Sequence, residues 1–214
     1  MGKKYIQQLI DQGEHVQQDF KFAVNDAKKI ARSMVAFANT EGGKLLVGVK
    51  DNGVIAGVRS EEEMYMLESA SALYSKPEVP YTIKAWNIDG KTILEVDVPK
   101  GAAKPYYAPN EENKWLVYIR VKDQNRLANK VILKVWENRR KNQGIFLEYS
   151  HNERFLLSYL EENHDISFSK LCRLTRMRRR DAENLLANLI ALNIVEPDFS
   201  SSKTITYKLK QQNQ

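Results

Sequence analysis

Two carboxylates near the amino terminus have the residue type and spacing for metal chemistry. Glu14 and Asp19 are separated by four residues, at the start of a segment with the alternation of a strand. Hard divalent cations such as Mg²⁺ and Mn²⁺ take carboxylate oxygens, and sites that cleave phosphodiesters use them. The alternative is that both side chains are solvated surface charges, and the residues alone leave that alternative open.

A second set of side chains suits contact with phosphates. Basic residues gather in the last third of the chain, where a short helix, a turn and a longer helix are expected. They are Lys170, Arg173, Arg176, Arg178, Arg179 and Arg180. Such side chains neutralise phosphates and bind base edges, so the cluster predicts contact with DNA. The alternative is an ordinary solvated face.

Composition limits the class of protein. The chain has 214 residues, a net charge of +6, a pI of about 9.2 and a single cysteine, Cys172. This length suits one large or two ordinary domains, and the positive charge favours an anionic partner. One cysteine excludes an intramolecular disulfide and a cysteine-rich zinc site. No apolar run approaches the ~20 residues that cross a bilayer, and no signal peptide is evident, so we expect a cytoplasmic protein without membrane contact.

The carboxylate pair must be positioned by the elements around it. Apolar residues at helical spacing predict a helix that ends at Gly13, and rough alternation predicts a strand over residues 16–22 with Val16, Phe20 and Phe22 at apolar positions. The next elements form one continuous unit. They are a helix from Asn25 or Asp26 to about residue 39, a Gly42-Gly43 turn, a central strand over residues 45–49, an Asn52-Gly53 hairpin turn and a partner strand over residues 54–58.

The following segment alternates between helical and strand patterns. We expect an acidic-capped helix from Ser60 to about residue 75, with its methionines in the core; strands over residues 81–88, 91–98 and 115–121; and a helix over residues 129–142. Basic and aromatic residues, among them Lys104 and Tyr106, interleave in the loop over residues 99–109. That loop either contacts phosphates and stacks on bases or is an ordinary edge loop.

The basic cluster belongs to a second set of elements. The expected order is a helix capped by Ser150 or Asn152, a short helix over residues 170–174 capped by Ser169, a longer helix over residues 178–192, and strands over residues 194–196 and 204–209. This is the order of a winged helix-turn-helix, and the segment is similar to that of many bacterial regulators. Such proteins place the start of the third helix in the major groove, and Lys203 in the wing would reach a neighbouring phosphate.

The segment AFANTEGGKLLVGVKDNGVIAGV resembles the core signature of the Schlafen AlbA-like domain, once called a divergent AAA domain. In that family two acidic residues, four residues apart and followed by Phe-Lys, precede the helix. The matching residues here are Glu14, Asp19, Phe20 and Lys21, with Asp19 in place of the more usual Glu. The runs KPYY at residues 104–107 and VYIRV at residues 117–121 also fit, so the resemblance covers roughly residues 13–130.

The resemblance implies a mixed α/β domain that binds nucleic acid. Its candidate contacts are Lys21, Lys104, Tyr106 and Arg120, the last of which we expect to project from the sheet. Many bacterial members are described as ATP-binding, but the chain has no GxxxxGK[ST] and no GxGxxG run, so ATP is not an expected cofactor.

The resemblance also implies a nuclease alternative, because some animal members are metal-dependent RNA endonucleases with three carboxylates. By position, Glu14, Asp19 and Asp51 would be the catalytic, metal-binding set for Mg²⁺ or Mn²⁺. The shorter side chain of Asp19 would alter the geometry of the metal, and the zinc site of the animal members needs more than one cysteine.

We therefore predict an α+β protein with an AlbA-like domain at residues 1–128, a connecting helix or linker at 129–147 and a winged helix at 148–210. The leading function is that of a DNA-binding transcriptional regulator that acts as a homodimer and needs no cofactor to bind DNA. The alternatives are a divalent-metal-dependent nuclease acting on RNA or single-stranded DNA, and a protein-interaction adaptor.

Overall fold

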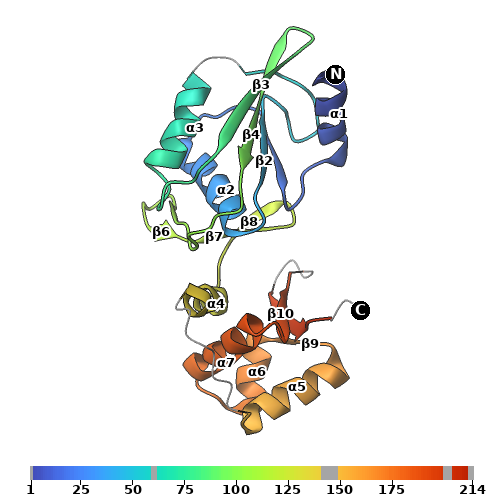
Figure 1. The fold of residues 1–214 in the computed structure, drawn as a ribbon, viewed down its shortest axis with the longest axis vertical. Helices are drawn as coiled ribbons and strands as arrows, with labels where there is room; N and C mark the ends of the chain where they lie inside the picture. The colour runs from blue at the N-terminus through green and yellow to red at the C-terminus, as the bar shows by residue number, and fades with distance from the viewer. Residues whose placement is uncertain (1, 59–61, 141–148, 200–203, 212–214) are drawn as a thin grey trace. The chain divides into compact units, whose positions relative to one another are not determined.

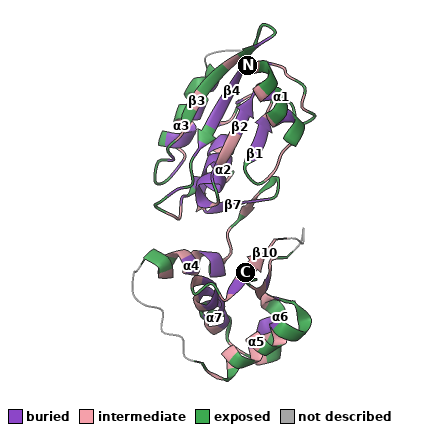
Figure 2. Cartoon of the chain, turned by 45° about the vertical axis from the view of Figure 1, so that its right-hand side comes forward, coloured by how far each residue is buried: buried purple, intermediate pink, exposed green. Residues whose placement is uncertain are grey.

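The computed structural model describes residues 2–58, 62–140, 149–199 and 204–211. The chain divides into two compact units, Met1–Ala128 and Asn129–Gln214, and each has its own hydrophobic core (Figures 1 and 2). The expected cap at Ser60 and the expected wing residue Lys203 lie outside the described residues. Within the described ranges, no helix combines the length and the apolar character needed to cross a bilayer.

The first unit is built on a four-stranded mixed sheet in the order β1-β2-β4-β3. Its elements are α1 (Gly2–Gln12), β1 (Gln18–Lys21), α2 (Ala27–Asn39), β2 (Gly43–Val47), α3 (Glu62–Ala72), β3 (Thr82–Ile88) and β4 (Lys91–Val98). Strands β1 and β2 run parallel, while β2 with β4 and β4 with β3 pair antiparallel. The sheet separates two cores: α1 covers one face, and α2, with α3 packed on it, covers the other (Figure 1). The expected α+β class is confirmed.

Helix α2 is the central element of this unit because nearly all of its residues are buried. Asp26 caps it, with the side chain accepting the backbone N–H groups of Lys28 and Lys29. Gly42 follows the helix with a φ of +76°, and its N–H donates to the carbonyl of Phe37 at 2.9 Å. A residue with a side chain rarely adopts that φ, so the glycine lets the chain turn directly into β2.

The structure corrects one expected element: residues 54–58 do not form the partner strand that we predicted there. Only one isolated bridge, between Val49 and Ile55, joins it to the end of the preceding segment. Strand β2 already pairs with β1 on one edge and β4 on the other, so neither edge is open to a further strand. Instead, Ala56 and Gly57 donate their N–H groups to the carbonyl of Gly48 at 2.8 and 2.9 Å, and the N–H of Val58 donates to the carbonyl of Thr92 on β4 at 2.7 Å.

Several apolar positions are also corrected. Val16 and Phe22 are exposed, because only Gln18–Lys21 form β1 and only Phe20 of the three expected apolar residues enters the core. Met64 and Met66 are likewise exposed, whereas the core face of α3 is made by Leu67 and Ala70 among others.

Four short strands complete the first unit: β5 (Ala108–Pro109), β6 (Trp115–Leu116), β7 (Tyr118–Val121) and β8 (Gln124–Leu127). They form two two-stranded ladders, β5 with β6 and β7 with β8. The strand expected over residues 115–121 is therefore two strands, and β8 has no counterpart in the sequence expectations. Strand β7 packs on α2, which brings the carboxyl-terminal part of this unit next to β1.

The second unit contains four helices and a three-stranded sheet in the order β10-β11-β9 among its described residues. Its elements are α4 (Lys130–Arg140), α5 (His151–Asn163), β9 (Asp165–Ser167), α6 (Phe168–Thr175), α7 (Arg179–Ala191), β10 (Val195–Asp198) and β11 (Thr206–Leu209). Ser150 caps α5 with a capping box, and Ser167 caps α6 in place of the expected Ser169. Strand β10 is one residue longer than the strand expected over residues 194–196, and β9 was not among the expected strands.

Helix α4 is more than a connector. Val131 and Val135 belong to the core of the second unit, and the Lys134 ammonium donates to the side chain of Asn184 on α7 at 2.7 Å. Asn129, just before the helix, accepts the N–H of Ile132 and donates to the hydroxyl of Tyr207. The helix that we expected in the linker at 129–147 is therefore part of the folded second unit.

Candidate functional site

Strand β1 holds Asp19 inside the first unit rather than on its surface. Alternation along the strand directs Phe20 into the core on the α1 side, so Asp19 faces α2, where the Ser33 hydroxyl donates to its Oδ2 at 3.3 Å. The residue is only 3% exposed. The alternative that this carboxylate is a solvated surface charge is therefore wrong.

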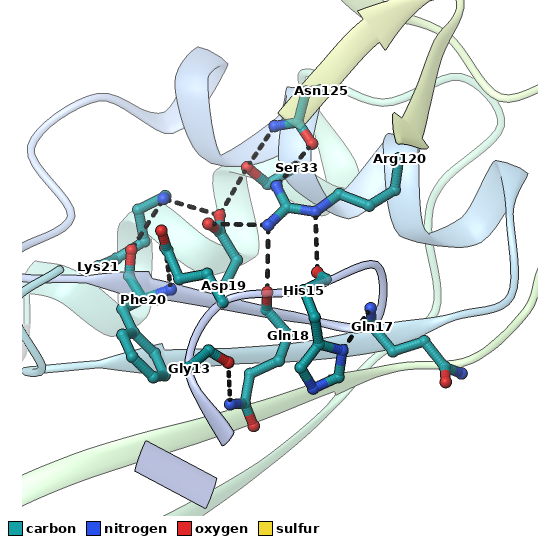
Figure 3. Close-up of polar contacts among 11 residues, drawn as sticks. Gly13, His15, Gln17, Gln18, Asp19, Phe20, Lys21, Ser33, Arg120 and Asn125 are labelled. Carbon is teal, nitrogen blue, oxygen red and sulfur yellow. Dashed lines mark hydrogen bonds and ion pairs between the residues drawn. The ribbon is translucent and has the colours of Figure 1, made fainter. Parts of the chain in front are cut away.

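Arg120 on β7 supplies a buried cation beside this carboxylate (Figure 3). Its Nη2 lies 3.2 Å from Oδ1 of Asp19 and also donates to the carbonyl of Gln18 at 3.1 Å. Its Nη1 donates to Oδ1 of Asn125 at 3.1 Å. The side chain is fully engaged and its residue is 4% exposed, so Arg120 does not project from the sheet as we expected.

Lys21 provides the second positive charge. Its Nζ lies 2.7 Å from Oδ2 of Asp19 and donates to the carbonyl of Phe20 at 2.8 Å. Asn125 on β8 donates to the Ser33 hydroxyl at 2.8 Å, which closes the network around the carboxylate (Figure 3). Both oxygens of Asp19 are thus bound by groups of the protein itself.

Glu14 and Asp19 differ in their affinity for a proton. Burial and a hydrogen bond to Asp19 raise the pKa of Glu14, although its Oε1 also accepts the N–H of Phe20 at 2.8 Å. Burial alone would raise the pKa of Asp19 as well, but the hydrogen bond from Glu14 and the charges of Lys21 and Arg120 outweigh it and lower that pKa. The pair therefore keeps Asp19 ionised and makes Glu14 the carboxyl that protonates first.

These residues do not fit a three-carboxylate metal site. Asp51 is exposed in the turn after β2, and Gly53 of the same turn lies against Ile10 of α1, on the face of the sheet opposite to Asp19. In the part of the chain that the structure describes, no three His, Cys, Asp or Glu side chains are grouped to hold a metal ion. The described part of the structure does not gather the three carboxylates of the nuclease alternative, Glu14, Asp19 and Asp51, and protein cations bind Asp19 where a metal would have to bind.

The expected nucleic-acid contacts of the first unit are similarly occupied. Tyr106 is buried in the core beside α2, so its ring is not available to stack on a base. The Nζ of Lys104 donates to the carbonyl of Thr40 at 2.7 Å. Both residues, like Lys21 and Arg120, hold the first unit together.

The basic cluster of the second unit is exposed. Lys170, Arg173, Arg176, Arg178, Arg179 and Arg180 are all exposed residues on α6, in the turn after it and at the start of α7. Arg176 ends α6 in the left-handed region, with a φ of +55°. The other side of α7 carries Leu185, Leu186 and Leu189 into the core, which leaves the amino-terminal arginines on the solvent side.

The orientation of these cations is set by local contacts. Arg178, at the N-cap of α7, is 87% exposed along its side chain and pairs with Asp181 at 2.8 Å. The Arg179 guanidinium lies 5.1 Å from the ring centroid of Phe168, and the Lys170 ammonium lies 5.1 Å from that of Tyr159. Aromatic rings at the base of the cluster therefore hold cationic side chains at the surface without neutralising them.

Sequence reasoning missed Ser33 and Asn125, which complete the Asp19 network. Ser33 reads as one more residue of a helix, and Asn125 lies on the strand that we did not expect. The alternation of β1 was the available signal for these partners. It places an acidic residue on a buried face of the strand, and a buried charge requires hydrogen-bonding partners.

Comparison with known proteins relates the first unit to other chains. Residues 14–129 match the family model described as Schlafen, AlbA_2. No curated protein matches the chain. The solved structures that are similar include the following two. The DIP2311 protein from Corynebacterium diphtheriae has 22% identity and a TM-score of 0.44, over 60% of this chain and 24% of that one. The N-terminal domain of a putative ATP-dependent DNA helicase RecG-related protein from Nitrosomonas europaea has 19% identity and a TM-score of 0.42, over 70% of this chain and 96% of that one. The chain thus spans about a quarter of the first of these structures.

Proposed function

Because the chain belongs to the Schlafen AlbA_2 family, we propose that it is a nucleic-acid-binding protein that binds duplex DNA through its second unit and regulates transcription. The family match supports a function related to nucleic acid. The exposed cations at the junction of α6 and α7 support the choice of duplex DNA and of the second unit.

The single observation that carries the proposal is the position of those cations on their helices. Six exposed basic residues lie on α6, in the turn that joins it to α7 and in the first turn of α7, while the opposite side of α7 is buried. In a winged helix-turn-helix, the start of the corresponding helix enters the major groove, and the following two-stranded hairpin flanks it. The order α5, α6, α7, β10, β11 supports this assignment for the second unit.

The chemistry of the cluster suits both parts of DNA recognition. The arginines at the helix start, Arg178 to Arg180, suit contacts with both base edges and neighbouring phosphates, and Lys170 and Arg173 on α6 suit contacts with phosphates on the flanking backbone. Recognition of a site by two copies of the chain is part of the proposal, since helix-turn-helix proteins read paired half-sites as dimers.

The test is duplex binding by the full chain over a range of salt concentrations. Replacing Arg178, Arg179 and Arg180 by alanine should weaken binding at least about tenfold, and it should flatten the slope of log K against log salt by about 0.9 for each phosphate that the variant no longer binds. A variant with Lys3, Lys4 and Lys29 replaced by alanine removes the same net charge from the first unit and serves as the control. Equal losses in the two variants, or an unchanged slope in the arginine variant, would contradict the proposal.

The metal-dependent nuclease has weaker support, because Lys21 and Arg120 bind the carboxylate that would hold its metal. It is tested by incubating RNA and single-stranded DNA with Mn²⁺ or Mg²⁺. Cleavage by the native chain that Asp19→Asn abolishes would favour the nuclease over the regulator.

A further inference from the structure

Strand β3 is an edge strand with an open backbone on one side. It is the last strand in the order β1-β2-β4-β3, and β4 is its partner throughout. Asp89 and Gly90, with φ of +51° and +80°, form the two-residue turn between β3 and β4, so Ile88 and Lys91 are the hydrogen-bonded pair that flanks it. Hydrogen-bonded and non-hydrogen-bonded pairs alternate along an antiparallel ladder, so the residue before Ile88 and every second residue before that have N–H and C=O groups that point away from β4. These residues are Asn87, Ala85 and Ile83.

A hydrogen bond elsewhere in the sheet agrees with this register. Thr92 faces Asn87 across the ladder, and its carbonyl accepts the N–H of Val58 at 2.7 Å on the side away from β3. Thr92 and Asn87 therefore form a pair without mutual hydrogen bonds, in agreement with the alternation along the ladder. Among the described residues, no backbone hydrogen bond reaches the outward groups of Ile83 and Ala85.

A groove runs beside this open edge. Tyr81 and Ile83 from β3 and its approach, and Met64, Tyr65 and Glu68 from α3, line a cavity of about 320 Å³. Apart from Glu68, the lining is mainly apolar and it is accessible, with Met64 47% and Tyr65 65% exposed. Since Tyr81 and Ile83 face the α2 side of the sheet, the groove lies between the edge strand and α3.

The groove carries negative charge in a protein whose net charge is +6. Glu68 is one of its lining residues, and Glu78 lies close enough to Tyr81 to affect its titration. Burial raises the pKa of the Tyr81 hydroxyl, and the charges of Glu68 and Glu78 raise it further. Both carboxylates are on exposed residues, so a basic side chain can reach them from solvent.

We propose that this surface binds an extended peptide segment of a partner protein, which adds to β3 as a fifth strand and places alternate apolar and basic side chains in the groove beside α3. The outward groups of Ile83, Ala85 and Asn87 supply the main-chain hydrogen bonds. Side chains two residues apart on a strand are about 6.6 Å apart, so one enters the apolar part near Met64 while the next lies at Glu68. This binding site is separate from the DNA-binding proposal and does not depend on it.

The test uses the full chain and an acetylated seven-residue peptide in which threonine alternates with leucine, lysine and leucine. Backbone amide shifts should move at Ile83, Ala85 and Asn87 and in the first two turns of α3, and not in β1. A matched peptide with glutamate in place of lysine should bind at least about fivefold more weakly.

Three variants separate the backbone contribution from the charge. Ala85→Pro removes an outward N–H without removing a bond to β4, and it should abolish binding, whereas Ala85→Thr keeps the N–H and should bind normally. Glu68→Lys leaves the strand intact and should reverse the preference between the two peptides, so it tests the proposal even where proline disturbs the fold.

Three results would overturn the proposal. The first is binding of neither peptide, and the second is binding of both with shifts outside β3 and α3. The third is a native chain that sediments as a dimer and becomes a monomer with Ala85→Pro, because the edge would then belong to a second copy of the chain.

Discussion

At the scale of single residues, cationic side chains of the first unit compensate the buried negative charge of Asp19. Asp19 is almost completely buried, and Arg120 and Lys21 bind both of its oxygens. Removing one partner of such a pair costs more than the pair contributes, because the remaining charge stays buried without compensation. Arg120→Met should therefore destabilise the first unit by about 3 kcal/mol at neutral pH.

The pH dependence gives this prediction its sign. The pKa of Asp19 is lowered in the folded chain, so its stabilising contribution is present above the unfolded pKa and is lost as pH falls through the folded one. The destabilisation by Arg120→Met should accordingly shrink in acid, and Asp19→Asn should recover part of it at neutral pH. Urea unfolding at several pH values measures both effects, with Arg126→Met on β8 as the matched control. A loss that is independent of pH would mean that Arg120 acts through packing alone.

At the scale of elements, Asn39 joins the end of α2 to strand β7 and to the segment just before β5, both of which lie far along the chain. Its amide nitrogen donates to the carbonyls of Tyr106 and Tyr118 at 2.9 and 2.8 Å, and its oxygen accepts the N–H of Tyr106 at 2.8 Å. Asn39→Ala leaves these three backbone groups buried without partners, so we expect a loss of about 3 kcal/mol in urea unfolding. Asn87→Ala removes one exposed hydrogen bond, to Gly90, and should cost less than about 1 kcal/mol. Equal losses would show that the Asn39 bonds are replaced by water.

What the sequence could predict also depends on scale. Local patterns are enough for α2, with its Asp26 cap, and for the β3–β4 hairpin with its Asp89-Gly90 turn, because each is specified by residues close together in the chain. The Asn52-Gly53 turn was expected to join two paired strands. Local patterns could not reveal that β4, from farther along the chain, pairs with β2 at the edge where the second of those strands was expected. Likewise, the spacing of residues 118–121 predicts a strand but not that Arg120 meets Asp19, about a hundred residues away. Contacts of that kind depend on the arrangement of the elements.

At the scale of the whole molecule, the proposed function assigns DNA binding to the second unit and not to the first. The polar cluster of the first unit is internal, whereas the basic cluster of the second is exposed. Each unit has its own core. Asn129 is the first residue of the second unit, and its side chain forms hydrogen bonds with Ile132 and Tyr207 of the same unit. A fragment that begins at Asn129 therefore keeps the hydrogen bonds that this side chain makes.

This organisation predicts that residues 129–214 fold alone and bind duplex DNA with the salt slope of the full chain. Trp136 belongs to the second unit, so its fluorescence reports the folding of the fragment. The slope reports how many phosphates are bound, which makes it a better measure than affinity, because affinity would also fall if the first unit helps two copies of the chain to associate. Residues 1–128 alone should bind the duplex weakly and with a shallow slope. A folded second fragment whose slope is smaller by about 1.8 or more, equivalent to two phosphates, would place part of the DNA interface on the first unit, since those phosphates would have to be bound by the residues removed.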